Sequence, residues 1–137
     1  MIFVDSNVLI DVLTPDQDWR DWSRGQITEL IKDDDLVVNS VVVAELASNF
    51  PDLEGLLGWF SAIPLAVRPL DEEVAFLAGQ AFRVYRRRHG ARVAILSDFL
   101  IGGHARHLGA VLLTRDAAIY RAYFPDLTLV TPENEND

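Results

Sequence analysis

The feature of this chain that most constrains its fold is an alternation between short apolar runs and longer segments of helical pattern. The short apolar runs predict buried strands at residues 2–4, 36–38, 65–67, 111–113 and 127–130. The helical patterns include one that ends near residue 13 and others at 19–31, 40–49, 53–62, 71–88, 97–107 and 116–122. Strands that alternate with helices build a mostly parallel sheet covered on both faces. We therefore expect a three-layer α/β/α sandwich around a mostly parallel five-stranded sheet.

The chain has 137 residues, of which 50% are hydrophobic, and this suits one compact domain. We expect that domain to span residues 1–130, followed by a disordered acidic tail at 131–137. The chain lacks cysteine, which excludes disulfides and thiolate zinc sites. The chain shows no leader pattern and no apolar run of about 20 residues, so we expect a cytoplasmic protein without a membrane span.

Three polar residues are predicted to begin helices. Ser40, Asp71 and Ser97 each precede a segment of helical pattern. Their side-chain oxygens can accept hydrogen bonds from the unpaired amides of a first helical turn. We therefore expect all three to be N-caps.

Four acidic residues are predicted to converge at one edge of the sheet. Asp5 directly follows the first predicted strand, and Asp116 follows the fourth. Glu45 lies in the early turns of the helix after the second strand, and Asp98 lies at the start of the helix that leads into the fourth. Open parallel sheets bind ligands beyond the carboxyl ends of their strands. These acids are therefore the candidate functional residues, and we call them the acid cluster.

Four carboxylates in one cleft repel one another unless cations neutralise them. Oxygen ligands of this kind suit Mg²⁺ or Mn²⁺ better than Zn²⁺. Such ions can polarise a phosphodiester and activate a bound water molecule. Taken singly, each aspartate is more often a helix cap and the glutamate more often a surface residue. Only their shared placement predicts metal-dependent phosphodiester hydrolysis.

The net charge of −9 counts against binding to nucleic acid, which usually requires a basic surface. The acid cluster accounts for part of that charge and would be neutralised by metal. Positive charge is also concentrated in one stretch, at Arg83, Arg86, Arg87, Arg88 and Arg92. That stretch is either a solvated helix face or a binding surface, and the sequence leaves both open.

In its motifs and their order, the chain resembles the PIN domain family, and more narrowly the VapC-type toxins of toxin–antitoxin pairs. The matching segments are residues 2–10 (IFVDSNVLI), 40–46 (SVVVAEL), 96–101 (LSDFLI) and 111–116 (VLLTRD). The resemblance implies the three-layer fold and a Mg²⁺- or Mn²⁺-dependent endoribonuclease. It also implies that Asp5, Glu45, Asp98 and Asp116 bind the metal and are catalytic.

The resemblance further implies that Ser6 or Asn7, together with Thr114, supports the site through hydrogen bonds. Arg115 is a further supporting candidate that either binds phosphate or pairs with an acid. Implied partners are a cognate antitoxin that obstructs the site, a second copy of the chain in a homodimer, and a structured RNA such as transfer or ribosomal RNA. Residues 102–104 (GGH) depart from the family pattern and predict a looser helix after Asp98.

Two other features have open or structural interpretations. His104 and His107 do not share a helical face with Asp98, so we expect both at the surface. The very apolar segment 53–60 either packs in the core or forms a surface for an antitoxin helix or a second copy.

Rival classes differ in what they require. Receiver domains and haloacid-dehalogenase-type phosphatases need a lysine near a late strand, whereas Lys32 is the only lysine here. The chain lacks the Gly-rich phosphate loop of P-loop NTPases. A non-catalytic PIN-fold RNA-binding or protein-interaction module remains an alternative, as does a PIN nuclease of housekeeping RNA processing.

Overall fold

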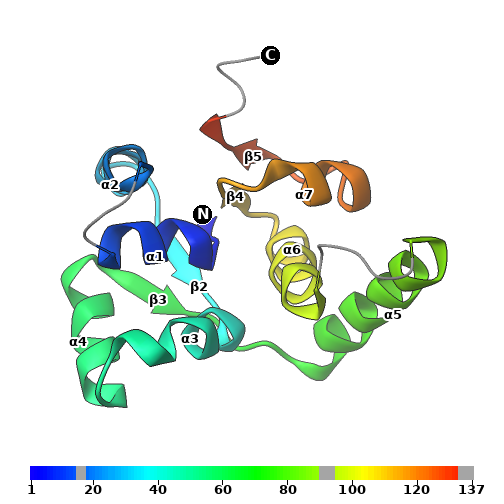
Figure 1. The fold of residues 1–137 in the computed structure, drawn as a ribbon, viewed down its shortest axis with the longest axis horizontal. Coiled ribbons are helices and arrows are strands. Elements are labelled where there is room, and N and C mark those ends of the chain that lie inside the picture. Colours follow the sequence, from blue (N-terminus) through cyan, green and yellow to red (C-terminus); the bar gives the residue numbers. More distant parts are fainter. Residues whose placement is uncertain (15–17, 90–94, 133–137) are drawn as a thin grey trace.

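The computed structural model describes residues 1–14, 18–89 and 95–132 (Figure 1). Within these ranges the chain forms a five-stranded parallel sheet in the order β3-β2-β1-β4-β5. The strands are β1 (Ile2–Val4), β2 (Leu36–Val38), β3 (Leu65–Val67), β4 (Val111–Leu113) and β5 (Leu129–Val130). The predicted sheet is confirmed, although β5 begins two residues later than expected.

Helices alternate with the strands as predicted. They are α1 (Ser6–Leu13), α2 (Arg20–Leu30), α3 (Ser40–Leu46), the short 3₁₀ helix η1 (Ala47–Asn49), α4 (Leu53–Ala62), α5 (Glu72–His89), α6 (Leu96–Leu108) and α7 (Ala117–Tyr123). Helix α1 packs against α2, and α5 lies alongside α6 (Figure 1). None of the helices in the described ranges is both long and apolar enough to cross a membrane.

The order of the strands reverses at the centre of the sheet. Strand β1 pairs with β2 on one side and with β4 on the other, with Ile2 opposite both Leu36 and Val111. The chain therefore leaves β1 in one direction and later returns on its other side. This is the kind of switch point at which open parallel sheets form their ligand sites.

Two glycines allow α6 to pack closely against its neighbours. A Cβ atom at Gly102 would lie 2.8 Å from the ring of Phe124 and 3.0 Å from that of Tyr120. A Cβ atom at Gly103 would lie 3.4 Å from Ala78 of α5. The expectation of a looser helix is wrong, because α6 runs unbroken and its glycines serve close packing.

Of the three predicted N-caps, one is confirmed and two are wrong. Asp71 caps α5 as predicted, accepting a hydrogen bond of 3.0 Å from the Val74 amide. Helix α3 is capped by Asn39 instead of Ser40, because the Asn39 side chain accepts hydrogen bonds from the amides of Val41 and Val42. Helix α6 begins one residue before Ser97, which therefore lies inside the helix with its hydroxyl free for another role.

His104 corrects a second expectation, since its side chain is buried with 2% exposure. Its Nδ1 lies 3.0 Å from Nδ2 of Asn39, and its ring meets Phe3 edge-on. The Asn39 amide nitrogen is a donor, so His104 Nδ1 must accept and the ring is neutral. Burial accordingly lowers the pKa of His104. The helical angle from Asp98 correctly excluded His104 from the site, but the face it occupies is core; His107 is exposed as expected.

The apolar segment 53–60 divides between core and surface. Leu56 and Phe60 are buried, whereas Leu53 and Leu57 are 62% and 43% exposed. The partly buried Trp59 lines a groove of about 330 Å³ between α1, α2 and α4. Part of the segment therefore packs in the core, as one interpretation expected, and part of it forms an exposed apolar surface, as the other expected.

Some sequence predictions concern the ends of the described ranges. Thr131 and Pro132, the first residues of the expected tail, are buried, whereas 133–137 lie outside the described residues. Arg92 of the basic stretch also lies outside them.

Candidate functional site

Asp5 is the innermost residue of the acid cluster. It directly follows β1 and is 5% exposed. Its Oδ2 accepts hydrogen bonds from the hydroxyls of Thr114 at 2.8 Å and Tyr120 at 3.0 Å. Its Oδ1 has only a long contact of 3.4 Å with the Ser6 hydroxyl. One carboxylate oxygen is therefore held from two sides, and the other is available to a further partner.

Glu45 reaches the same place from α3. Its side chain is exposed, and its two oxygens accept hydrogen bonds from Ser6 at 2.5 Å and Ser97 at 3.1 Å. Ser6 has a single hydroxyl proton, so its short contact with Glu45 takes precedence over the long one with Asp5. Two serine hydroxyls, one from α1 and one from α6, thus hold Glu45 beside Asp5.

Asp98 and Asp116 complete the cluster from two helix starts. The partly buried Asp98 accepts a hydrogen bond of 3.0 Å from the Ile95 amide. The exposed Asp116 precedes α7, and its amide donates to the Thr114 hydroxyl at 3.0 Å. Since that hydroxyl in turn donates to Asp5, Thr114 joins the ends of β1 and β4.

The four carboxylates act on one another electrostatically. Burial raises the pKa of Asp5 to about 6 against the hydrogen bonds from Thr114 and Tyr120, and the charges of Asp98 and Glu45 raise it further. Burial also raises the pKa of Asp98, with smaller contributions from Asp116 and Glu45. Each acid therefore interacts with at least one other, and the structure brings together the four residues that the sequence singled out.

The donor chemistry of this group suits a hard divalent cation, because every candidate ligand atom is a carboxylate oxygen. Repulsion between the acids and the burial of Asp5 are both relieved by a bound cation. Across the described parts of the chain, however, no group of three or more acid or imidazole side chains is already arranged to hold an ion. Binding would therefore require side-chain rotation, which the exposed Glu45 and Asp116 allow.

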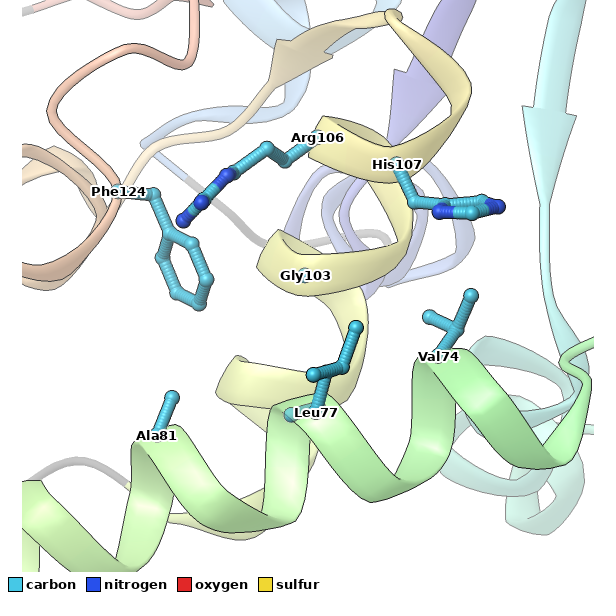
Figure 2. A pocket seen from close by; sticks show the side chains of 8 residues that line it. Val74, Leu77, Ala81, Gly103, Arg106, His107 and Phe124 are labelled. Atoms are coloured by element: carbon cyan, nitrogen blue, oxygen red, sulfur yellow. The ribbon is translucent and has the colours of Figure 1, made fainter.

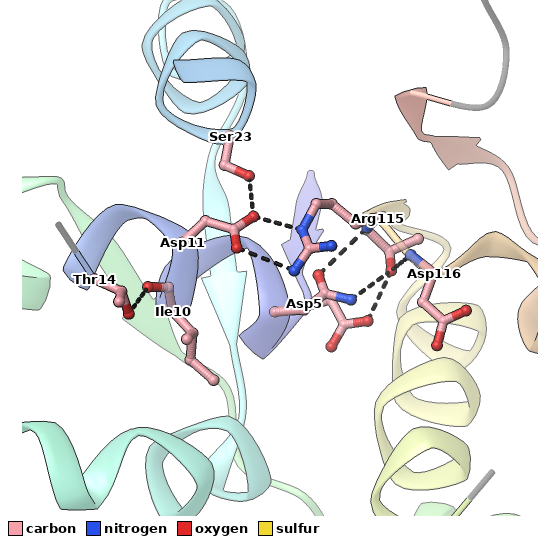
Figure 3. Close-up of polar contacts among 9 residues, drawn as sticks. Asp5, Ile10, Asp11, Thr14, Ser23, Arg115 and Asp116 are labelled. Atoms are coloured by element: carbon pink, nitrogen blue, oxygen red, sulfur yellow. Dashed lines mark hydrogen bonds and ion pairs between the residues drawn. The ribbon is translucent and has the colours of Figure 1, made fainter. Parts of the chain in front are cut away.

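The supporting residues all contact the site or the turn beside it. Asn7 donates to the Thr114 hydroxyl at 3.4 Å and accepts from the Arg115 amide at 3.3 Å. The Arg115 side chain pairs with Asp11 through two hydrogen bonds, which favours the acid-pairing interpretation over phosphate binding (Figure 3). Tyr120 also contacts the site, and burial and the nearby charge of Asp5 raise its pKa well above the ordinary value.

Sequence reasoning missed Asp11 and Tyr120. A signal existed for each at helical spacing, because Asp11 lies four residues after Asn7 and Tyr120 four residues after Asp116. Residues four apart share a helical face, so each of the two could have been expected beside a site residue.

A separate groove lies away from the acid cluster. It has a volume of about 390 Å³ and lies between α5 and α6, with Phe124 at one side (Figure 2). Its lining is mainly apolar and includes no member of the acid cluster. The acids instead lie at the carboxyl edge of the sheet, where a long polymer could reach them.

Comparison with known proteins agrees with the geometry. The PIN domain family matches residues 2–125, which is nearly the whole chain. This chain belongs to the PIN domain family. Within that family it belongs with the VapC ribonucleases: it is 36% identical over 105 residues to Ribonuclease VapC10 of Mycobacterium tuberculosis, covering 77% of this chain and 74% of that protein.

Solved structures agree with the PIN fold. A VapBC2 complex from Rickettsia felis bound to a promoter DNA fragment matches with a TM-score of 0.68 and 23% identity, covering 96% of this chain and 98% of that chain. FitAcB from Neisseria gonorrhoeae matches with a TM-score of 0.67 and 25% identity, covering 96% and 98%. The α/β fold expected from the sequence is confirmed.

Proposed function

We propose that this PIN domain protein is a Mg²⁺- or Mn²⁺-dependent endoribonuclease that acts as the toxin of a toxin–antitoxin pair. The observation that carries the proposal is the acid cluster itself. Its members come from four separate parts of the chain and interact at the switch point of the sheet. The identity to a protein named as a ribonuclease supports RNA as the substrate.

In this proposal, Oδ1 of Asp5 and the carboxylates of Glu45, Asp98 and Asp116 would hold the cation. When bound, such an ion polarises a phosphodiester and lowers the pKa of a bound water molecule. The chain's own residues set the geometry: Thr114 and Tyr120 hold Oδ2 of Asp5 and leave Oδ1 available.

Ser6 and Ser97 orient the exposed Glu45 in the same way, by hydrogen bonds to its carboxylate. Both hydroxyls donate to the carboxylate and hold it beside Asp5.

The proposal includes protein partners. The two structures compared above are named as VapBC2 with promoter DNA and as FitAcB, and a further match, from Klebsiella pneumoniae, is named as a toxin–antitoxin complex. We extend this to a cognate antitoxin for the present chain, with the groove beside Trp59 as its docking surface. A homodimer, a cytoplasmic location and a structured RNA target, such as transfer or ribosomal RNA, complete the proposal.

The test is cleavage of total RNA by the purified protein with Mg²⁺ or Mn²⁺, beside samples with EDTA and samples of Asp5→Asn. A matched control is Asp33→Asn. Asp33 is an exposed aspartate before the amino end of β2, whereas the acid cluster lies at the carboxyl edge of the sheet. We expect discrete fragments from the wild type and the control only. Metal binding without cleavage of any RNA would favour the non-catalytic module, and absence of metal binding would refute the mechanism.

A further inference from the structure

A buried carboxylate outside the acid cluster holds the neighbour of one of its members. Asp11 of α1 is 1% exposed and accepts hydrogen bonds from Arg115 Nε at 2.6 Å and Nη2 at 3.0 Å. Ser23 of α2 donates to the same carboxylate at 2.6 Å. Two parallel bonds from a planar guanidinium fix both direction and distance (Figure 3). Arg115 is therefore tied to α1, and through Asp11 to α2.

The same face of α1 holds the backbone of this turn. Asn7, one helical turn before Asp11, accepts from the Arg115 amide and donates to the Thr114 hydroxyl. Helix α1 therefore holds residues 114 and 115 at three points: the Arg115 amide, the Thr114 hydroxyl and the Arg115 guanidinium. Thr114 and Asp116, which flank Arg115, are both part of the site.

The charge arrangement separates Arg115 from a role in binding substrate. Its guanidinium extends toward Asp11, whereas the Asp116 carboxylate lies on the other side of the turn (Figure 3). The indole ring of Trp19 lies 5.5 Å from the guanidinium carbon and covers it further. The Arg115 guanidinium therefore has two partners within the protein, Asp11 and Trp19.

The pair is buried on its Asp11 side and partly exposed on its Arg115 side. A buried ion pair often gives no more stability than apolar residues of similar size, because both charges lose their water. What apolar packing does not give is a fixed orientation. The position of this pair, between two residues of the site, makes that orientation useful for the site.

We propose that Asp11 and Arg115 form a positioning clamp, which holds the β4–α7 turn so that Thr114 and Asp116 keep their places around a divalent cation. Neither residue touches substrate in this scheme. The inference rests on the proposed metal-dependent function and adds two positioning residues to it.

The test uses the full chain and two measurements, Mn²⁺ affinity by calorimetry and cleavage kinetics on an RNA that the wild type cuts. For Asp11→Asn we expect Mn²⁺ affinity and kcat to fall by about 10- to 100-fold, as is typical for outer partners of metal ligands. KM should stay within about twofold, since the clamp does not contact RNA. Arg115→Lys keeps the charge but loses the two-bond geometry, so an intermediate loss is expected.

The matched control is Arg106→Gln, compared with Arg115→Gln. Arg106 pairs with Asp126 at 3.4 Å on the surface of α6, and we expect its replacement to leave both measurements unchanged. A clamp role for Arg115 predicts lost Mn²⁺ affinity, whereas a raised KM alone would mean contact with RNA and would overturn the proposal.

Other outcomes are also decisive. Wild-type Mn²⁺ affinity and kcat in a folded Asp11→Asn variant would overturn the clamp. If Asp11→Asn does not fold, as judged by circular dichroism, Arg115→Lys decides by the same criterion. If the wild type binds Mn²⁺ but cuts no RNA, the proposed nuclease function fails, and the comparison of Mn²⁺ affinities still decides the clamp.

Discussion

The two sides of the acid cluster are built differently. Around Asp5 the site is buried, and its Oδ2 is held by two hydroxyls, one from Thr114 directly after β4 and one from Tyr120 of α7. Around Glu45 and Asp116 it is exposed, and Glu45 is held by the hydroxyls of the buried Ser6 and the partly buried Ser97. A buried carboxylate is fixed but costly to ionise, whereas an exposed one is inexpensive and can rotate. The site thus combines one rigid candidate ligand with others that can adjust.

The largest effect is expected from breaking the buried side with Asp5→Asn. Cleavage should fall by more than about a hundredfold, because the fixed candidate ligand is lost. The same variant should gain about 1–3 kcal/mol in free energy of unfolding, since the pKa of about 6 shows that the ionised form is disfavoured. Thermal melting in EDTA measures this gain. An Asp5→Asn variant less stable than the wild type would contradict the view that the ionised Asp5 destabilises the folded protein.

The pH dependence of stability sharpens the comparison. The folded-state pKa of Asp5, about 6, is above its ordinary value of 3.8, so its contribution is present in full below 3.8 and is lost as pH rises through 6. In EDTA, the stability gap between Asp5→Asn and wild type should therefore narrow by roughly 1 kcal/mol from pH 7 to pH 5.

Urea unfolding at the two pH values gives this gap. His104, whose pKa is lowered, acts in the opposite sense: its contribution is lost as pH falls below about 6.5. Because His104 is present in both proteins, it cancels from the difference. A gap that is constant or widens toward pH 5 would contradict the assignment to Asp5.

A smaller effect is expected from Tyr120→Phe, which removes one donor from Asp5 Oδ2 and keeps the ring. A hydrogen bond to a charged group contributes about 1.5–3 kcal/mol, so Mn²⁺ affinity should fall by about tenfold or more. The pKa of Asp5 should also rise, because this bond lowers it. Carboxylate titration by NMR would measure the shift, and an unchanged pKa would show that Thr114 alone orients Asp5.

The smallest effect is expected on the exposed side, from Ser97→Ala. This change removes one hydroxyl from Glu45, while Ser6 still holds the other oxygen. Stability should stay within about 0.5 kcal/mol and cleavage within a few-fold of wild type. A loss as large as that of Tyr120→Phe, measured in the same assays, would erase the proposed difference between the two sides.

Much of the fold and the acid cluster could be predicted because local pattern determines them. The run before Asp5 is continuously apolar, as a strand buried on both faces must be, and the carboxyl ends of parallel strands share one edge. Those two facts were enough to bring Asp5 and Asp116 together.

The details that the sequence did not predict depend on contacts between distant parts of the chain. Asn39 and Ser40 are both good N-caps, and the choice between them depends partly on His104 behind the helix. The partner of Arg115 lies 104 positions away, so no local pattern could distinguish an acid from a phosphate. The burial of His104 was missed because a helical angle gives a direction without saying what lies there.

The close approach at Gly102 limits how accurately the site is built. Phe124 and Tyr120 occupy the space that a methyl group would need, so the absence of a side chain at Gly102 allows both rings to pack directly against α6. A larger residue would displace α7 outward and carry the Tyr120 hydroxyl away from Asp5, where a bond of 3.0 Å tolerates little extension. A residue without a side chain thus limits how precisely the Asp5 carboxylate is held, although it has no functional group of its own.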